Sequence, residues 1–497
     1  MDRRRLAAAA AALVIAAHPS SDAWASVGDS VTDLMAVVNG SPQALPYPQV
    51  IVFLNFQIHP LTYANGADGT CAQASGGVIG SIAFSGDGRV TGFTSDSSNL
   101  VSPDTIFGVP DLFAHEPYHV APPAPATCAT SMANLRTDGT QVLANAGDAH
   151  LSGDGRFMAF VSASNALLPA GEDTNGAQDV FVRDFELGVT ERVSIADDGS
   201  EGVLVGAPGT PTARTPDISQ DADGCYVAFA SRATNLVPGD TNFAEDIFVR
   251  DRCLGTTERV SVSAAGDQAS ADSYSPAISD DGCVIAFQSP AMDLAPPMDV
   301  SFLDDIFVRD RCLGTTEQIS PADVDGFGAP SYGFPNLSGD GCTVVFGTDD
   351  PNLVPGDTNG VADTFVVDRC PLASPIVYER VNVPDPSTGQ SEADMGSLVA
   401  EVSANGPWVV FASQATNLVP DDTNAQQDCF VRDRAMGRTA RVSLDADGNE
   451  IARGGFGPHI SSDGRWILWG TIEALFPGDG GLDGDLFIVA NPLYDGP

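Results

Sequence analysis

The chain has 497 residues, of which 66 are acidic and 23 are basic, and its formal net charge is −43. Such an excess of carboxylates repels phosphate backbones and excludes nucleic acid as a natural partner. Beyond the N-terminus no apolar stretch has the length of a transmembrane helix, and the length alone suggests about three domains unless a repeat unites them.

The first 25 residues have the pattern of a secretory signal peptide. A basic start is followed by the apolar run Leu6–Ala17, and Ala23-Trp24-Ala25 forms an A-x-A cleavage site before Ser26. We therefore expect residues 1–25 to be removed and residues 26–49 to form a short N-terminal segment. The mature protein is expected to be secreted or periplasmic.

From about residue 50 the chain repeats one unit, which Asp221–Val262 contains in full. A short strand leads to a Gly turn, and three further alternating or apolar runs follow, separated by an Asp/Asn loop and a second turn. Four short strands repeated in tandem are typical of a β-propeller. We predict an all-β fold, a seven-bladed β-propeller of four-stranded antiparallel blades over residues 50–497. The seven Gly turns are Asp87-Gly88, Asp154-Gly155, Asp223-Gly224, Asp281-Gly282, Asp340-Gly341, Asn405-Gly406 and Asp463-Gly464.

The last repeat lacks an outer strand, because the chain stops soon after Ile488. The β-rich run Val50–Gln57, followed by Leu61–Tyr63, precedes the first Gly turn and has no blade of its own. We predict that residues 50–64 supply the outer strand of blade 7 and close the ring, which removes open sheet edges.

The elements S-x-DG-x-x-V-A-F, D-[IV]-F-V-R-D and T-E-R-V-S resemble the WD40-like β-propeller repeat of TolB-type proteins over about residues 50–490. This resemblance implies the propeller fold. TolB also has an N-terminal α/β domain that docks partners of the cell envelope, whereas only Ser26–Gln49 precede the propeller here. The resemblance therefore implies no specific partner.

Six of the nine cysteines occupy the same two blade positions in three consecutive repeats. The ends of adjacent antiparallel strands are neighbours at a distance that suits a disulfide, and export favours oxidation. In blade 2 the same positions hold Arg156 and Glu186, which predict an ion pair. Cys71, Cys128 and Cys429 have no evident partner, and Cys429 is expected to be a buried thiol. The predicted disulfides are Cys225–Cys253, Cys283–Cys312 and Cys342–Cys370.

Six loops between the second and third strands place Asp at positions 1 and 7, and four of them have Asn at position 3. Ca²⁺ takes oxygen ligands from such clusters. The alternative is structural, with an Asx turn at position 1, Asn in a left-handed conformation and the last Asp capping the strand; a cationic ligand is a third reading. The candidate Ca²⁺ ligands are Asp173, Asn175, Asp179, Asp240, Asn242, Asp246, Asp299, Asp305, Asp357, Asn359, Asp363, Asp422, Asn424, Asp428, Asp479 and Asp485.

Motifs of catalysis are weak in this sequence. His115–His119 matches H-E-x-x-H, but a zinc protease needs that motif on a helix and Pro117 stands in its middle. No G-x-S-x-G elbow or phosphate-binding Gly loop is found in a strand-turn-helix setting. His150 and His459 occupy similar places, each just before a Gly turn.

We therefore expect an exported, non-enzymatic binding or protein-interaction module, monomeric and possessing Ca²⁺ as its cofactor, whose partner is a protein or a small cationic ligand. The alternative is a metal-dependent propeller enzyme of the lyase or hydrolase type. Its site would lie in the central channel, and several His residues converging there would favour it.

Overall fold

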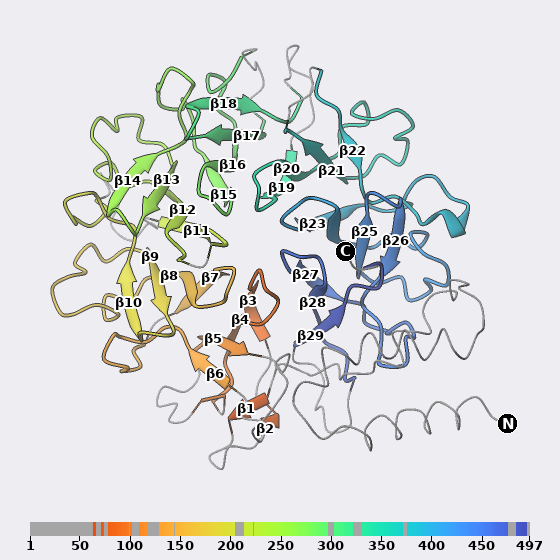
Figure 1. The fold of residues 1–497 in the computed structure, drawn as a ribbon, viewed down its shortest axis with the longest axis horizontal. Coiled ribbons are helices and arrows are strands. Elements are labelled where there is room, and N and C mark those ends of the chain that lie inside the picture. Colours follow the sequence, from red (N-terminus) through yellow and green to blue (C-terminus); the bar gives the residue numbers. More distant parts are fainter. Residues whose placement is uncertain are drawn as a thin grey trace.

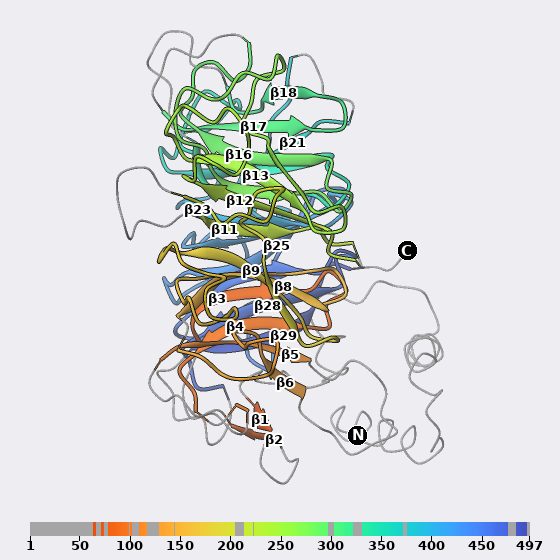
Figure 2. The ribbon, with the colours of Figure 1, turned by 90° about the vertical axis from the view of Figure 1, so that its left-hand side faces the viewer.

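The computed structural model describes residues 63–65, 71–73, 78–98, 100–101, 109–116, 129–143, 145–203, 213–221, 223–296, 303–321, 331–370, 375–475 and 484–494. Seven small antiparallel sheets surround a central axis (Figure 1), and they lie within one thick disc when seen from the side (Figure 2). The predicted all-β, seven-bladed propeller is confirmed. Among the described residues the helical content is one 3-10 turn, Pro386–Thr388.

Each blade is a meander whose first strand lies nearest the axis and whose last strand lies at the rim (Figure 1). The strands of the first four blades are β3 (Val78–Phe84), β4 (Thr91–Ser95), β5 (Asp111–Glu116) and β6 (Ala129–Met132); β7 (Ala146–Leu151), β8 (Phe157–Ser162), β9 (Asp179–Asp184) and β10 (Val189–Arg192); β11 (Ala213–Ile218), β12 (Tyr226–Ser231), β13 (Asp246–Asp251) and β14 (Thr256–Arg259); and β15 (Tyr274–Ile278), β16 (Val284–Ser289), β17 (Asp305–Asp310) and β18 (Thr315–Gln318).

The remaining blades continue the same order, and the described part of blade 7 has three strands. Their strands are β19 (Ser331–Leu337), β20 (Thr343–Thr348), β21 (Asp363–Asp368) and β22 (Glu379–Arg380); β23 (Ser397–Val402), β24 (Trp408–Ser413), β25 (Asp428–Asp433) and β26 (Arg438–Arg441); and β27 (Phe456–Ile460), β28 (Trp466–Thr471) and β29 (Asp485–Ala490).

The Gly turns are held by the residues that made them recognisable in the sequence. In blade 2 the Ser152 hydroxyl donates to Asp154 Oδ1 at 2.9 Å and accepts the amide N–H of Phe157 at 3.0 Å. Gly155 has φ of +73°, which an L side chain adopts at a cost. The turn therefore needs Ser, Asp and Gly together.

Each blade has its own core, built on an aromatic pair from the second and third strands. Phe160 on β8 lies opposite Phe181 on β9, and their ring centroids are 5.8 Å apart. Both rings are fully buried. The aromatic residue that follows each Gly turn takes this place in all seven blades: Phe93, Phe160, Phe229, Phe287, Phe346, Phe411 and Trp469.

The three predicted disulfides are confirmed, because each Cys pair joins the start of the second strand to the end of the third. Their Cα–Cα distances are 5.4, 5.4 and 5.1 Å. The ion pair predicted for blade 2 is also present, with Arg156 Nη1 2.8 Å from Glu186 Oε2. Cys429 is a buried free thiol as expected, and burial raises its pKa well above the usual value.

After an outer strand the chain forms a short finger that caps the next blade. In blade 2 the finger is closed by the bridge between Ile195 and Glu201. The Thr257 hydroxyl of blade 3 donates to the Ile195 carbonyl at 2.6 Å, and the Thr257 amide donates to Asp197 Oδ1 at 2.7 Å. Such caps occupy N–H groups of the rim strand that would otherwise template another strand.

Two expectations for the N-terminal region have different outcomes. Residues 1–62 lie outside the described residues, so the signal peptide, the segment 26–49 and most of the predicted closing strand remain predictions. Tyr63 and Ala64 belong to β1 (Tyr63–Asn65), which pairs with β2 (Cys71–Gln73) in a separate two-stranded sheet. In the described parts of the chain, no helix combines the length and apolarity needed to cross a membrane.

Candidate functional site

In four blades the Asp/Asn loop surrounds an arginine that comes from the outer strand of the same blade. In blade 2, Arg192 Nη1 lies 3.5 Å from Asp173 Oδ1 and 3.5 Å from Asp179 Oδ2. All three side chains are nearly inaccessible to solvent. The guanidinium therefore lies among the carboxylates at positions 1 and 7, where a bound cation was expected.

The same arrangement recurs in blades 3, 5 and 6, so it is a property of the repeat. In each case one Nη1 atom lies between the two Asp side chains. The distances to positions 1 and 7 are 3.3 and 3.2 Å for Arg259 with Asp240 and Asp246, 3.7 and 3.0 Å for Arg380 with Asp357 and Asp363, and 3.5 and 3.4 Å for Arg441 with Asp422 and Asp428.

A third carboxylate, which was not predicted from the sequence, completes three of these loops. Arg192, Arg380 and Arg441 bind Glu201, Glu392 and Glu450 at 3.1, 3.1 and 2.7 Å. Each Glu lies nine to twelve residues after its arginine, at the base of the finger. In blade 3 a neutral Gln268 takes this place, and its Oε1 accepts from Arg259 at 3.1 Å. Three loops thus have three carboxylates for one guanidinium, whereas blade 3 has two.

The loop Asn residues form turns with their own backbone. Asn175 Oδ1 accepts the amide N–H of Ala177 at 2.9 Å, while Asn175 Nδ2 donates to Asp179 Oδ2 at 3.0 Å. This supports the Asx-turn interpretation, although the turn starts at position 3 and not at position 1. We expected Asn itself to be left-handed, but the left-handed residue is the one that follows Asn. These residues are Gly176, Phe243, Gly360 and Ala425, with φ between +53° and +67°.

In blades 1 to 6 the last Asp of the loop is fixed by a Ser or Asn that follows the outer strand, which we call the latch residue. In blade 6 the Ser443 hydroxyl donates to Asp428 Oδ1 at 2.6 Å and accepts the amide N–H of Cys429 at 3.0 Å. This supports the predicted capping role of the last Asp. The pairs are Asp111–Asn134, Asp179–Ser194, Asp246–Ser261, Asp305–Ser320, Asp363–Asn382 and Asp428–Ser443.

Blade 6 brings three acidic side chains of the described residues close together. Oxygens of Asp422, Asp428 and Glu450 lie within 4.8 Å of one another, an arrangement that could hold a metal ion. Burial raises the pKa of Asp422 to about 6 despite the nearby Arg441. Burial also acts to raise the pKa of Glu450, but hydrogen bonds from Thr423 and Arg441 lower it to about 2. Arg441 acts to lower both pKa values, so Asp422 differs from Glu450 because burial and the neighbouring Asp428 and Glu450 carboxylates raise its pKa more strongly.

The other predicted ligands are only partly placed. Asp305 and Asp485 begin β17 and β29 and are buried, whereas Asp299 and Asp479 lie outside the described residues. Blade 4 has Gln318 where four other blades have arginine. A second acidic group, Asp221, Asp223 and Cys225, offers no thiolate because Cys225 is in a disulfide.

The H-E-x-x-H match does not form a helical metal site. His115 lies on β5, and its Nδ1 is 2.9 Å from the hydroxyl of Thr130 on the neighbouring β6. His119 lies outside the described residues. The expectation that this motif is not a zinc-protease helix agrees with the strand.

Two histidine–carboxylate pairs occur on the inner strands around the axis. His150 Nδ1 on β7 lies 3.1 Å from Asp217 Oδ1 on β11, and His459 Nδ1 on β27 lies 2.9 Å from Glu401 Oε2 on β23. The pKa of His150 is raised: desolvation by the surrounding protein acts to lower it, although the side chain is 51% exposed, and Asp217, Glu401 and Asp148 outweigh that effect. Because Glu401 affects both histidines, the two pairs are electrostatically linked.

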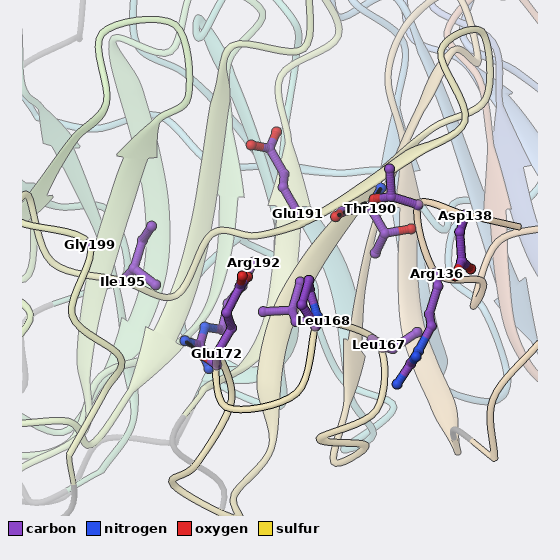
Figure 3. A pocket seen from close by; sticks show the side chains of 12 residues that line it. Arg136, Asp138, Leu167, Leu168, Glu172, Thr190, Glu191, Arg192, Ile195 and Gly199 are labelled. Atoms are coloured by element: carbon purple, nitrogen blue, oxygen red, sulfur yellow. Dashed lines mark hydrogen bonds between the residues drawn. The ribbon is translucent and has the colours of Figure 1, made fainter. Parts of the chain in front are cut away.

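A cleft of about 950 Å³ lies at the rim between blades 1 and 2 (Figure 3). It extends from Arg136 and Asp138, past Leu167 and Leu168, to Ile195. Several of its charged side chains already have partners within the protein, as Glu191 has in Arg252. Arg192, for example, faces three carboxylates. The cleft therefore offers few free polar groups to a ligand.

Comparison with known proteins places the fold but not the family. No protein-family profile matches the chain, and no curated protein matches it. Similar solved structures include the β-propeller domain of the trilobed protease from Pyrococcus furiosus, with 10% identity, a TM-score of 0.47 and coverage of 85% of this chain and 100% of that chain. Oligogalacturonate lyase from Vibrio parahaemolyticus has 12% identity, a TM-score of 0.46 and coverage of 87% and 92%.

TolB from Acinetobacter baumannii is also among the similar structures, with 13% identity, a TM-score of 0.33 and coverage of 63% of this chain and 59% of that chain. The predicted resemblance to TolB-type propellers is confirmed as a resemblance of fold. At these identities the similar proteins, which include a protease domain and a lyase as well as TolB, assign no activity.

Proposed function

We propose that this chain is an exported, non-enzymatic binding module, monomeric, whose partner is a protein or a small ligand with cationic groups. The main observation behind the proposal is that basic side chains are few and that many of them form ion pairs within the protein. The sequence has 23 basic residues, all of them arginine, against 66 acidic ones. Many of these arginines, such as Arg192 and Arg441, are held in ion pairs within the blades.

The unbalanced carboxylates then dominate the surface potential. A strongly negative surface attracts basic partners and repels polyanions. Three intrablade disulfides support export to an oxidising compartment, secreted or periplasmic. The latch residues and loop arginines support a rigid scaffold, because the polar residues that recur in the repeat are used to hold strands together.

A direct test uses the purified mature protein with spermine and with poly-L-lysine, and with poly-L-glutamate as the control. Titration calorimetry at low and at physiological ionic strength is expected to give saturable binding of the cationic probes, weakened by salt, and none of the anionic polymer. Absence of cation binding at low ionic strength would remove the proposal.

We also propose that the loop residues predicted as ligands bind Ca²⁺. In blade 6 the ion would compete with Arg441 for these residues. A metal at Asp422, Asp428 and Glu450 would share their oxygens with Arg441. We therefore propose weak Ca²⁺ binding, with arginine as the resident cation of blades 2, 3, 5 and 6. Thermal unfolding with chelator, with millimolar Ca²⁺ and with Mg²⁺ tests this, because a ligand specific to the folded state raises Tm.

A second candidate is an enzyme with its site in the central channel, favoured by the two histidine–carboxylate pairs. A carboxylate on Nδ1 leaves Nε2 of His150 and of His459 as the ring nitrogen for proton transfer or metal binding. A screen of hydrolase and lyase substrates, with and without chelator, tests this candidate. Activity lost in both His150→Gln and His459→Gln, but kept in His115→Gln, would favour it over the binding module.

A further inference from the structure

Phe243 combines two features that cost free energy in the folded protein. Its backbone φ is +57°, a left-handed conformation that bulky residues rarely adopt, and 68% of the residue is exposed to solvent. The three other loops with Asn at position 3 have Gly176, Gly360 and Ala425 in this place, also left-handed. The turn itself therefore favours a small residue, and an exposed phenyl ring offsets little of the strain by packing.

The loop fixes the position of this ring. Asn242 Oδ1 accepts the amide N–H of Ala244 at 3.2 Å, and Asn242 Nδ2 donates to Asp246 Oδ2 at 3.0 Å and to the Ala269 carbonyl at 3.1 Å. Both chain neighbours of Phe243 are thus tied to the blade. A partner that binds the ring has little backbone entropy to remove, which favours binding.

The arginines beside this loop already have counter-ions. Arg214 and Arg232 both contact Glu245 of the same loop, and Arg232 also binds Asp272. Inside the loop one arginine, Arg259, is shared by two carboxylates. Carboxylates therefore outnumber arginines in and beside the loop, and Asp272 keeps 38% of its side chain exposed. The surroundings of the ring favour a cation over an anion.

Elsewhere in the chain an aromatic ring and a carboxylate hold an arginine together. Arg252 of blade 3 lies over the ring of Phe157 in blade 2, with its Cζ 4.5 Å from the ring centroid, and its Nη2 is 2.7 Å from Glu191. Arg311 of blade 4 lies over Tyr226 of blade 3 at 5.1 Å. The quadrupole of the ring attracts the cation, and the carboxylate adds a charged hydrogen bond. Within the fold this combination joins neighbouring blades.

We propose that Phe243 is the anchor on which the propeller holds an arginine or lysine side chain of a basic protein partner, with the carboxylates beside the loop as counter-ions. The alkyl stem of the bound side chain packs on the ring, and its charged head reaches the carboxylates. This inference rests on the proposed function, and it names the surface and the chemistry of the contact. Binding then accounts for a strained aromatic residue at an exposed position.

Binding of octa-arginine to the mature protein tests the proposal, measured by titration calorimetry at physiological ionic strength to limit non-specific attraction. Phe243→Gly should lower the affinity about tenfold, because the ring no longer covers the bound side chain, whereas Phe243→Tyr should retain it. Leu254→Ser removes a similarly exposed apolar residue from the turn between β13 and β14, at the opposite face of the disc. It is the matched control and should bind as the parent protein does.

Thermal unfolding separates this role from a structural one. Phe243→Gly should not lower Tm, since Gly adopts this φ without strain. A lower Tm would show that the ring packs within the fold and would overturn the anchor. Equal affinity of the parent and Phe243→Gly for octa-arginine would also overturn it while leaving the proposed function intact. Failure of the parent itself to bind octa-arginine or spermine would remove the proposed function and the anchor with it.

Discussion

Arg441 Nη1 lies 2.7 Å from Glu450 Oε1 while it also lies between Asp422 and Asp428, and its side chain is only 7% exposed. The guanidinium is thus the counter-ion of three carboxylates in a site from which water is largely excluded. Removing one partner of such a buried group leaves uncompensated charge, which is costly. We therefore expect this loop to need a metal ion as its counter-ion only when Arg441 is absent.

Arg441→Gln is expected to make the stability of the protein depend on Ca²⁺. Without the guanidinium, three carboxylates face one another, and the loss should be about 3–5 kcal/mol in chelator. Ca²⁺ should restore much of this, because it binds the folded loop. Urea unfolding with chelator and with millimolar Ca²⁺ measures the effect.

Arg259→Gln is the matched variant, since Gln268 leaves only Asp240 and Asp246 in its loop. Its rescue by Ca²⁺ should be weaker. Arg453→Gln, at an exposed position, should change nothing. Equal responses of Arg441→Gln and Arg259→Gln would show that Glu450 does not contribute to metal binding.

Asp422→Asn is expected to stabilise the protein at neutral pH. The pKa of Asp422 is raised to about 6 in the folded state, above the unfolded value near 4. Between these values the folded state binds more protons, so this group's contribution to stability falls as pH rises from about 4 to about 6. The variant removes that loss, and its advantage should reach about 1–3 kcal/mol at pH 7 and vanish near pH 4.

Chemical unfolding at pH 4, 5, 6 and 7 checks this prediction. Asp421→Asn, at the exposed neighbouring position, is the control and should show no such trend. Glu450 has the opposite sign, because its pKa is lowered to about 2. Its contribution is present above pH 4.5 and is lost as pH falls toward 2, so Glu450→Gln should destabilise at pH 7. A constant difference between Asp422→Asn and the parent protein at all four pH values would contradict the assignment.

Ser443→Ala is expected to cost about 1–3 kcal/mol, because it leaves both Asp428 Oδ1 and the Cys429 amide without their partner. The latch is fully buried, so water does not replace it. A double-mutant cycle with Asp428→Asn measures the coupling by urea unfolding. Additive effects of the two substitutions would mean that the latch bond contributes nothing on its own.

The blades were predictable from the sequence because each of their features is local. Ser-x-Asp-Gly turns, alternating runs and the spacing of Cys225 and Cys253 all act within one hairpin, where register fixes which residues are neighbours. The seven Gly turns therefore gave the blade number. The pairing of Arg156 with Glu186 followed from the same register.

The loop arginines were not predicted, although the sequence contains a signal for them. Asn at position 3 and Arg at the end of the outer strand occur together in blades 2, 3, 5 and 6, and blades 1 and 4 have neither. The two residues are separated by the whole third strand, as Asn424 is from Arg441, so the pattern of the loop itself does not contain the arginine. Glu450 is still further away and enters the site only because the finger folds back at Leu444.

A fourth disulfide should form in blade 2 when Arg156 and Glu186 are both replaced by Cys. These positions correspond to the Cys pairs of blades 3 to 5, whose Cα atoms are 5.1–5.4 Å apart. Closing a loop of about 30 residues contributes roughly 3–4 kcal/mol in the chain-entropy model. The gain should be smaller here, because Arg156 also binds Asp184 at 2.8 Å.

The measurement is Tm with and without reductant, compared with Arg156→Cys alone. The oxidised double variant should melt above the parent protein, whereas Arg156→Cys should melt below it because Asp184 loses its partner. Reduction of the parent lowers Tm through the three native bonds, so the informative quantity is the difference between the two proteins in each state. A double variant that forms the bond but gains no stability when oxidised would mean that the Arg156 contacts with Asp184 and Glu186 stabilise blade 2 as strongly as a disulfide does.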